Sequence, residues 1–143
     1  MSDDIAERPG AAGRGQATVM REAHFPDRAP VDAYGDGGFR FAGMSHRGAI
    51  MCLPSGIYGW AAENPDDLSD RKLFDRATGE GDALELLFVG TGTDLVPLQA
   101  SVRSHLEEHT IRTEVMATGA AIRTFNVLLA EGRLVGAALL PVG

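Results

Sequence analysis

The chain has 143 residues, of which 44% are hydrophobic and 23% are charged, and its formal net charge is −7. This length suits one domain with a core large enough to fold without metal or disulfide staples. The negative charge argues against nucleic acid or an anionic membrane as a partner.

The sequence contains one cysteine, Cys52, inside an apolar stretch, so we expect a buried, inert thiol and no intramolecular disulfide. No apolar run is long enough for a membrane-spanning helix, and the first residues lack the basic and apolar regions of a secretory signal. Three early acids (Asp3, Asp4 and Glu7) also argue against a transit peptide. A cytoplasmic protein is therefore expected.

Residues 1–23 are small, polar and glycine-containing, and they show no apolar periodicity. Such a composition cannot bury enough apolar surface to offset the entropy of ordering the chain. We expect a disordered tail there, followed by a single folded domain at 24–143.

The first part of this domain has the pattern of strands and turns. An Asp-Gly turn signal between residues 31–34 and 38–42 predicts one β-hairpin. A Pro-Ser-Gly turn between the apolar runs at 46–53 and 57–60 predicts a second hairpin.

The second half alternates strands with helices of about 13 residues, which is typical of right-handed βαβ crossovers and a mainly parallel sheet. After a candidate helix at 68–77, the expected elements are strands at 84–89, 111–116 and 134–140 and helices at 97–109 and 118–130. The fold class is therefore α/β, with a β-hairpin layer from the N-terminal half.

The helix expected at 118–130 is the best defined of these elements. Thr118 can cap its start and Gly132 can end it. Its apolar residues recur with helical spacing at Ala121, Ile122, Phe125, Leu128 and Leu129. Arg123 and Asn126 lie on the polar side.

The Gly-Thr-Gly stretch at 90–92 stands between an expected strand and an expected helix, as in dinucleotide-binding loops. The third glycine of that fingerprint is replaced by Leu95, and no Gly-Lys-Ser/Thr follows. Asp94 would repel a phosphate, and Pro97 is expected to open the helix. A structural turn is favoured over a phosphate site.

Residues 105–109 read His-Leu-Glu-Glu-His, which fits the H-x-x-E-H motif of a zinc-protease family. A zinc site needs a third protein ligand, and the chain after this motif offers only Glu114 and Glu131. Histidines near a helix C-terminus interact favourably with the helix dipole without a metal. No metal or cofactor is predicted, and the absence of a complete catalytic constellation favours a non-enzymatic protein.

One geometric inference remains. If the strands at 84–89 and 111–116 are parallel, the segments that follow them leave from the same carboxyl edge, where open α/β folds bind ligands. The candidate ligand-binding crevice consists of Gly90, Thr91, Gly92, Asp94, Thr118, Gly119, Arg123 and Asn126. The alternative, which is favoured, is that Arg123 pairs with Asp94 or Glu114 and ties the helix to the sheet.

Four separated motifs agree in order and spacing with one known family. They are LFVGTG at 87–92, EVMATGAAIRTFNVL at 114–128, EGR at 131–133 and AALLPV at 137–142. Together they resemble the Mth938-like domain family over residues 25–143. That family is small and largely uncharacterised, and its mitochondrial member acts as a respiratory complex I assembly factor.

The resemblance implies a three-layer α/β domain with a central mixed sheet and no established enzymatic activity. It places the family's glycine loop on residues 90–92 and its arginine and asparagine on Arg123 and Asn126. Phe125 departs from the family, which commonly has tyrosine there, and this weakens an enzymatic interpretation.

The leading hypothesis is a non-enzymatic protein-interaction domain that acts as an assembly factor for a membrane-bound respiratory complex. Protein partners are expected; nucleic acid and an integral membrane segment are not. The alternative is a small-molecule or anion-binding protein, or a weak enzyme, that uses the crevice between the 90–92 loop and the helix start at 118–126.

Overall fold

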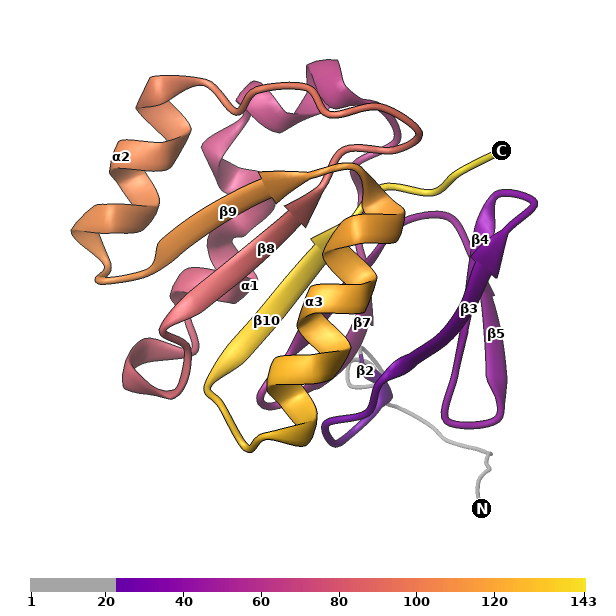
Figure 1. Cartoon of the computed structure of the whole chain (residues 1–143). Helices are drawn as coiled ribbons and strands as arrows, with labels where there is room; N and C mark the ends of the chain where they lie inside the picture. The colour runs from indigo at the N-terminus through magenta and orange to yellow at the C-terminus, as the bar shows by residue number, and fades with distance from the viewer. Residues whose placement is uncertain (1–22) are drawn as a thin grey trace, which may run out of the picture.

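The computed structural model describes residues 23–143. The tail expected at 1–23 therefore lies outside the described residues, except for Ala23, which begins the first strand. A six-stranded mixed sheet has the order β2-β7-β6-β10-β8-β9, and a three-stranded antiparallel sheet has the order β3-β4-β5 (Figure 1). The strands are β2 (Ala23–Phe25), β3 (Val31–Gly35), β4 (Gly38–Phe41), β5 (Met44–Arg47), β6 (Ile50–Leu53), β7 (Gly56–Gly59), β8 (Leu86–Gly90), β9 (Arg112–Met116) and β10 (Val135–Leu139).

The three C-terminal strands confirm the predicted βαβ crossovers. β8 is parallel to both β9 and β10, with α2 (Ala100–Glu108) and α3 (Thr118–Ala130) as the connecting helices. The strands β6, β7 and β2 extend the same sheet in antiparallel pairing. The sheet is therefore mixed, and its parallel part is the half that the sequence period indicated.

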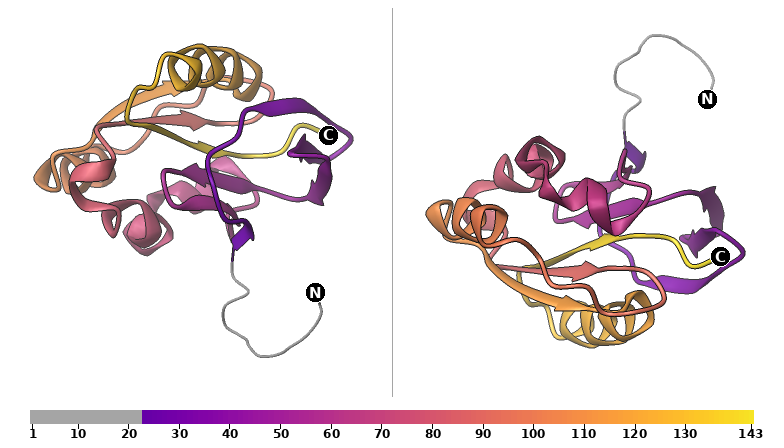
Figure 2. Two further views of the ribbon diagram at one scale, coloured as in Figure 1. Left: turned by 90° about the horizontal axis from the view of Figure 1, so that it is seen from below. Right: turned by 90° about the horizontal axis from the view of Figure 1, so that it is seen from above.

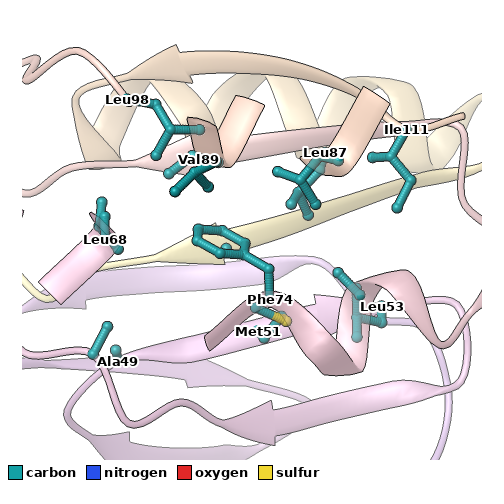
Figure 3. Packing of buried hydrophobic residues seen from close by; sticks show 14 of the residues in the cluster. Ala49, Met51, Leu53, Leu68, Phe74, Leu87, Val89, Leu98 and Ile111 are labelled. Atoms are coloured by element: carbon teal, nitrogen blue, oxygen red, sulfur yellow. The ribbon is translucent and has the colours of Figure 1, made fainter. Parts of the chain in front are cut away.

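Two separate apolar cores confirm the three layers. Alternate residues of β8 point to opposite faces, so Leu87 and Val89 join one core while Leu86 and Phe88 join the other. The first core lies under α1 (Asp75–Thr78), α2 and the turns that precede α1, where Phe74 packs towards the sheet (Figure 3). The second lies under α3 and the three-stranded sheet, and Figure 2 shows α3 and α1 on opposite sides.

The apolar run expected as one strand at 46–53 is two strands in different sheets. Met44–Arg47 pairs with β4, whereas Ile50–Leu53 pairs with β7 and β10. The chain changes sheets at Gly48, whose φ of 92° is accessible to glycine at little cost. Both predicted hairpins are present, as β3-β4 and β6-β7, and β4-β5 forms a third.

The helix expected at 68–77 is replaced by short turns. Two 3-10 turns, Pro65–Ser69 and Arg71–Phe74, precede α1, and a third, Gly81–Ala83, follows it. Asp70 is extended, with ψ at 108°, and its carboxylate accepts a hydrogen bond from Lys72 N, so a new turn begins there. The aspartate that ends one turn therefore starts the next.

The two crossover helices differ in how well the sequence locates them. α2 begins at Ala100, three residues after Pro97, because the chain stays extended while buried Leu98 packs into the first core. α3 has the predicted bounds. It ends as expected at Gly132, whose φ is 78°, with Arg133 N bonded to Leu128 O.

Candidate functional site

The carboxyl ends of β8, β9 and β10 meet at one edge of the large sheet, as the parallel arrangement predicted. The loop after β8, the first turn of α3 and the C-terminal residues lie together there (Figure 1). Hydrogen bonds join Thr91 N to Met116 O and Leu140 N to Gly90 O, each at 2.9 Å. This edge carries most of the residues of the candidate crevice.

Thr118 connects three of these segments. It is fully buried, and its hydroxyl donates to Leu140 O at 2.7 Å and accepts from Gly92 N at 2.9 Å. Its own backbone N donates to Gly92 O at 2.8 Å. Thr118 therefore does not cap α3, for which Ala117 is the N-cap residue.

Gly90 sits directly against the start of α3. A Cβ added at Gly90 would lie 2.9 Å from Thr118 Cα and 2.9 Å from Leu139 Cδ2, so only glycine fits between β10 and the helix. The 90–92 loop is thus in direct contact with the start of α3. Binding of a ligand between them remains a prediction.

Thr91 organises the loop that follows. Its hydroxyl lies 2.6 Å from Asp94 O and accepts a hydrogen bond from Val96 N at 3.0 Å. Only 2% of its surface is exposed. The backbone of residues 91–96 is therefore folded around this side chain, which accounts for the residue without a ligand.

A hollow does exist at this edge, on the side away from α3. It has a volume of about 260 Å³. Its lining residues are Thr91, Gly92, Thr93, Asp94, Val96, Leu140 and Pro141, together with Glu63, Asn64 and Pro65. Three of the predicted site residues, Thr91, Gly92 and Asp94, line the hollow. The carboxylates of Glu63 and Asp94 make it unsuited to an anion.

The 63–65 segment was not among the predicted site residues. Asn64 caps the turn that begins at Pro65, and the Asp67 carboxylate accepts hydrogen bonds from Glu63 N at 2.8 Å and Asn64 N at 3.2 Å. The Asn-Pro-Asp-Asp sequence signals this capped turn. It gives no indication that the turn lies beside a loop nearly 30 residues later.

Asn126 does not face the carboxyl edge. Its Oδ1 accepts from Val31 N at 3.0 Å, and its Nδ2 donates to Val31 O at 2.9 Å. The space beside Gly119 is also filled, because a Cβ there would collide with the Tyr34 hydroxyl. Asn126 therefore holds β3 against α3, and Gly119 allows Tyr34 to approach the helix closely.

Arg123 is exposed on α3. Its expected pairing with Asp94 or Glu114 is wrong: within residues 23–143 no salt bridge joins Arg123 to either acid. The reason is geometric, because Arg123 lies on the solvent side of a helix whose opposite side packs on the sheet through Ala121, Ile122 and Phe125.

The H-x-x-E-H motif spans the end of α2. The rings of His105 and His109 meet edge to face, with centroids 4.9 Å apart, and His109 Nδ1 lies 3.0 Å from His105 O. In the part of the chain that the structure describes, no three His, Cys, Asp or Glu side chains are grouped to hold a metal ion.

Cys52 is buried as predicted, and burial raises the pKa of its thiol to about 12.

Two large apolar side chains are exposed in the loop beside the hollow. Leu95 is 58% exposed and Val96 is 36% exposed. Among residues 23–143, no helix has the length and apolar character needed to cross a membrane.

Comparison with known proteins gives consistent results. Residues 31–140 match the family described as protein of unknown function (DUF498/DUF598). An uncharacterised protein of Rhodobacter capsulatus is 38% identical over 122 residues, which cover 85% of this chain and 92% of that protein. The mouse NADH dehydrogenase [ubiquinone] 1 alpha subcomplex assembly factor 3 is 31% identical over 122 residues, covering 85% of this chain and 65% of the mouse protein.

Solved structures agree with the family match. A crystal structure described as an outer membrane protein from Bartonella henselae has a TM-score of 0.80 and 52% identity, covering 84% of this chain and all of that chain. A Bordetella pertussis protein described as a Mth938-like domain has a TM-score of 0.70 and 31% identity, covering 79% of this chain and 85% of that one.

Proposed function

Because the chain belongs to the DUF498/DUF598 family of Mth938-like domains, we propose that it is a non-enzymatic protein-interaction domain that assists the assembly of a membrane-bound respiratory complex. The observation that carries this proposal is the similarity to assembly factor 3 of NADH dehydrogenase, which extends over 85% of this chain. The chain spans about two thirds of the length of that mouse relative, so the activity of the whole relative transfers only as part of the proposal.

The exposed pair Leu95 and Val96 is the proposed contact with a partner protein. The loop that carries them is held in shape by Thr91, so little conformational entropy is lost when a partner binds. Apolar side chains on such a rigid support are suited to be buried in an interface.

Purification of the tagged full chain from its own cells, in mild detergent, tests this function. We expect subunits of the respiratory complex in the eluate and a lower level of assembled complex in a deletion strain. If the deletion strain assembles the complex normally and no respiratory subunit is recovered, the proposal fails.

A matched pair of variants tests the contact surface. Leu95 and Val127 are equally exposed, at 58% and 57%, but Val127 lies on α3. We expect Leu95→Lys to abolish co-purification of the partner and Val127→Lys to preserve it. Loss with both variants, or with neither, would place the interface elsewhere.

The proposal includes a cytoplasmic location. The Bartonella henselae relative is described as an outer membrane protein, so the two locations need to be separated by experiment. Fractionation of cells that express the tagged chain at native level should recover it in the cytosol, and recovery in the outer-membrane fraction would contradict this location.

A second candidate function, small-molecule binding, is favoured by the hollow at the carboxyl edge. Its charge suits a neutral or cationic molecule better than an anion, because Glu63 and Asp94 line it. Amide chemical shifts in a small-molecule screen provide the test. Changes at Gly92, Thr93 and Asn64 would support this function, while changes at Gly119 and Arg123 would instead support a ligand between the 90–92 loop and the start of α3.

A further inference from the structure

The outer face of the three-stranded sheet is a second, separate surface. Val31, Phe39 and Phe41 point into the second core. Because side chains alternate along a strand, Arg40 between the two phenylalanines points the opposite way, to solvent. A hollow of about 530 Å³ lies on this strand region and shares no lining residue with the hollow at the carboxyl edge.

The strand register defines which residues share this outer face. Arg40 is paired with Ser45, and Gly38 is paired with Arg47. Arg40 and Arg47 are therefore diagonal neighbours on adjacent strands, a separation of about 7–8 Å across which long side chains can meet. The other two corners carry a glycine and a small hydroxyl residue.

The neighbouring strand leaves the same space open. Ala33 is paired with Arg40, and Gly35 is paired with Gly38. Of the six positions on this outer face, two carry the arginines and the other four carry glycine, alanine or serine. The small side chains leave space beside the two arginines, where the hollow lies, and Arg47 Nη1 reaches Asp36 O in the turn at one end of it.

Neither arginine of this face makes an ion pair within residues 23–143. Arg40 makes no hydrogen bond or ion pair within residues 23–143, and Arg47 Nη1 donates to Asp36 O at 3.2 Å. A guanidinium has five N–H donors, so Arg47 keeps most of its donors free. Asp36 is the one acidic residue that lines the hollow, and it lies in the turn rather than between the arginines. Two like charges at diagonal positions repel each other unless an anion joins them.

We propose that this outer face binds a small soluble phosphate ester, with the phosphate between Arg40 and Arg47 and the Ser45 hydroxyl as a further donor. A carboxylate is satisfied by one arginine fork, whereas a phosphate presents oxygens in several directions and accepts from two. The hollow lies within the usual volume range of ligand pockets, which leaves space for the organic part of the ester. This site is independent of the assembly function.

Titration of the full chain with inorganic pyrophosphate, followed by amide NMR at low ionic strength, tests the site. We expect saturable shifts at Gly35, Gly38, Ser45 and Arg47. Arg40→Gln and Arg47→Gln should each weaken binding about tenfold or more, since each removes charge-assisted hydrogen bonds. Ser45→Ala should weaken it less. No saturable shift at millimolar pyrophosphate would overturn the proposal.

Arg112→Gln is the matched control, because Arg112 is an exposed strand arginine on β9, in the other sheet. Binding should be unchanged in this variant, and equal weakening in all three arginine variants would show that only net charge matters, against a defined site. Sedimentation with phosphatidylglycerol vesicles separates a lipid headgroup from a soluble ester. Vesicle binding that depends on Arg40 and Arg47 would overturn the soluble ligand.

Discussion

The Asn126 side chain holds the backbone of Val31 through two hydrogen bonds, one accepted by Oδ1 and one donated by Nδ2. The amide thus serves both polar groups of Val31, as a neighbouring strand would. It joins α3 to the first residue of β3 across 95 positions of the sequence. Asn126 is a connection between two parts of the fold rather than a ligand contact.

Replacement of this amide should destabilise the fold. In Asn126→Ala both Val31 groups lose their partners, and we expect the free energy of unfolding to fall by about 1–3 kcal/mol, although alanine is the better helix former. Arg123→Ala, on the solvent side of the same helix, should change it by no more than about 0.5 kcal/mol. Urea unfolding measures both, and equal losses would contradict the assignment.

The close contact at Gly90 gives a second prediction. Gly90→Ala places a Cβ 2.9 Å from the backbone of Thr118, which cannot move without breaking the bonds between Thr118, Gly92 and Leu140. Overpacking of this kind costs about 1–3 kcal/mol. Thermal unfolding should show a clear drop in Tm. Gly35→Ala is the comparison, because a Cβ there meets no atom within 4 Å and only its φ of 139° is unfavourable.

Burial of Cys52 predicts a dependence of stability on alkaline pH. Burial raises the pKa of this thiol from about 9.0 to about 12, so the native state keeps the proton at pH values where the unfolded chain loses it. The unfolded state then binds fewer protons, and stability falls as the pH rises from about 9 towards 12. Unfolding of Cys52→Ala should show a shallower decline over this range. Identical slopes in the two proteins would refute the prediction.

His24 predicts the opposite dependence at acid pH. Its ring faces that of His46, with centroids 4.4 Å apart, and burial, followed by repulsion from His46, lowers the pKa of His24 below its ordinary value of 6.5. The unfolded chain therefore binds more protons below pH 6.5, and stability falls as the pH is lowered through that value. Chemical unfolding at several pH values should show a smaller acid loss for His24→Gln. His109→Gln, at the residue that follows α2, should leave the loss unchanged.

Elements with strong local signals were predicted correctly. The apolar spacing of α3 and the glycine that ends it are local features, so both of its ends follow from a few adjacent residues. The hairpins at 31–41 and 50–59 follow likewise from their turns. The run at 46–53 does not reveal its division into two strands, because a change of sheet at Gly48 alters hydrogen-bond partners and not the apolar pattern.

The sequence by itself determined the α/β class, the parallel C-terminal crossovers and the position of the 90–92 loop at the carboxyl edge, because periodicity and turn residues act over short distances. Only the tertiary structure decided what this loop faces. That Glu63 and Pro141 line the same hollow depends on how distant segments pack, and the same packing uses Asn126 and Thr118 to hold the fold together. Side chains that looked available in the sequence are thereby engaged by backbone groups, while Arg40 and Arg47 are brought to one face by strand pairing alone.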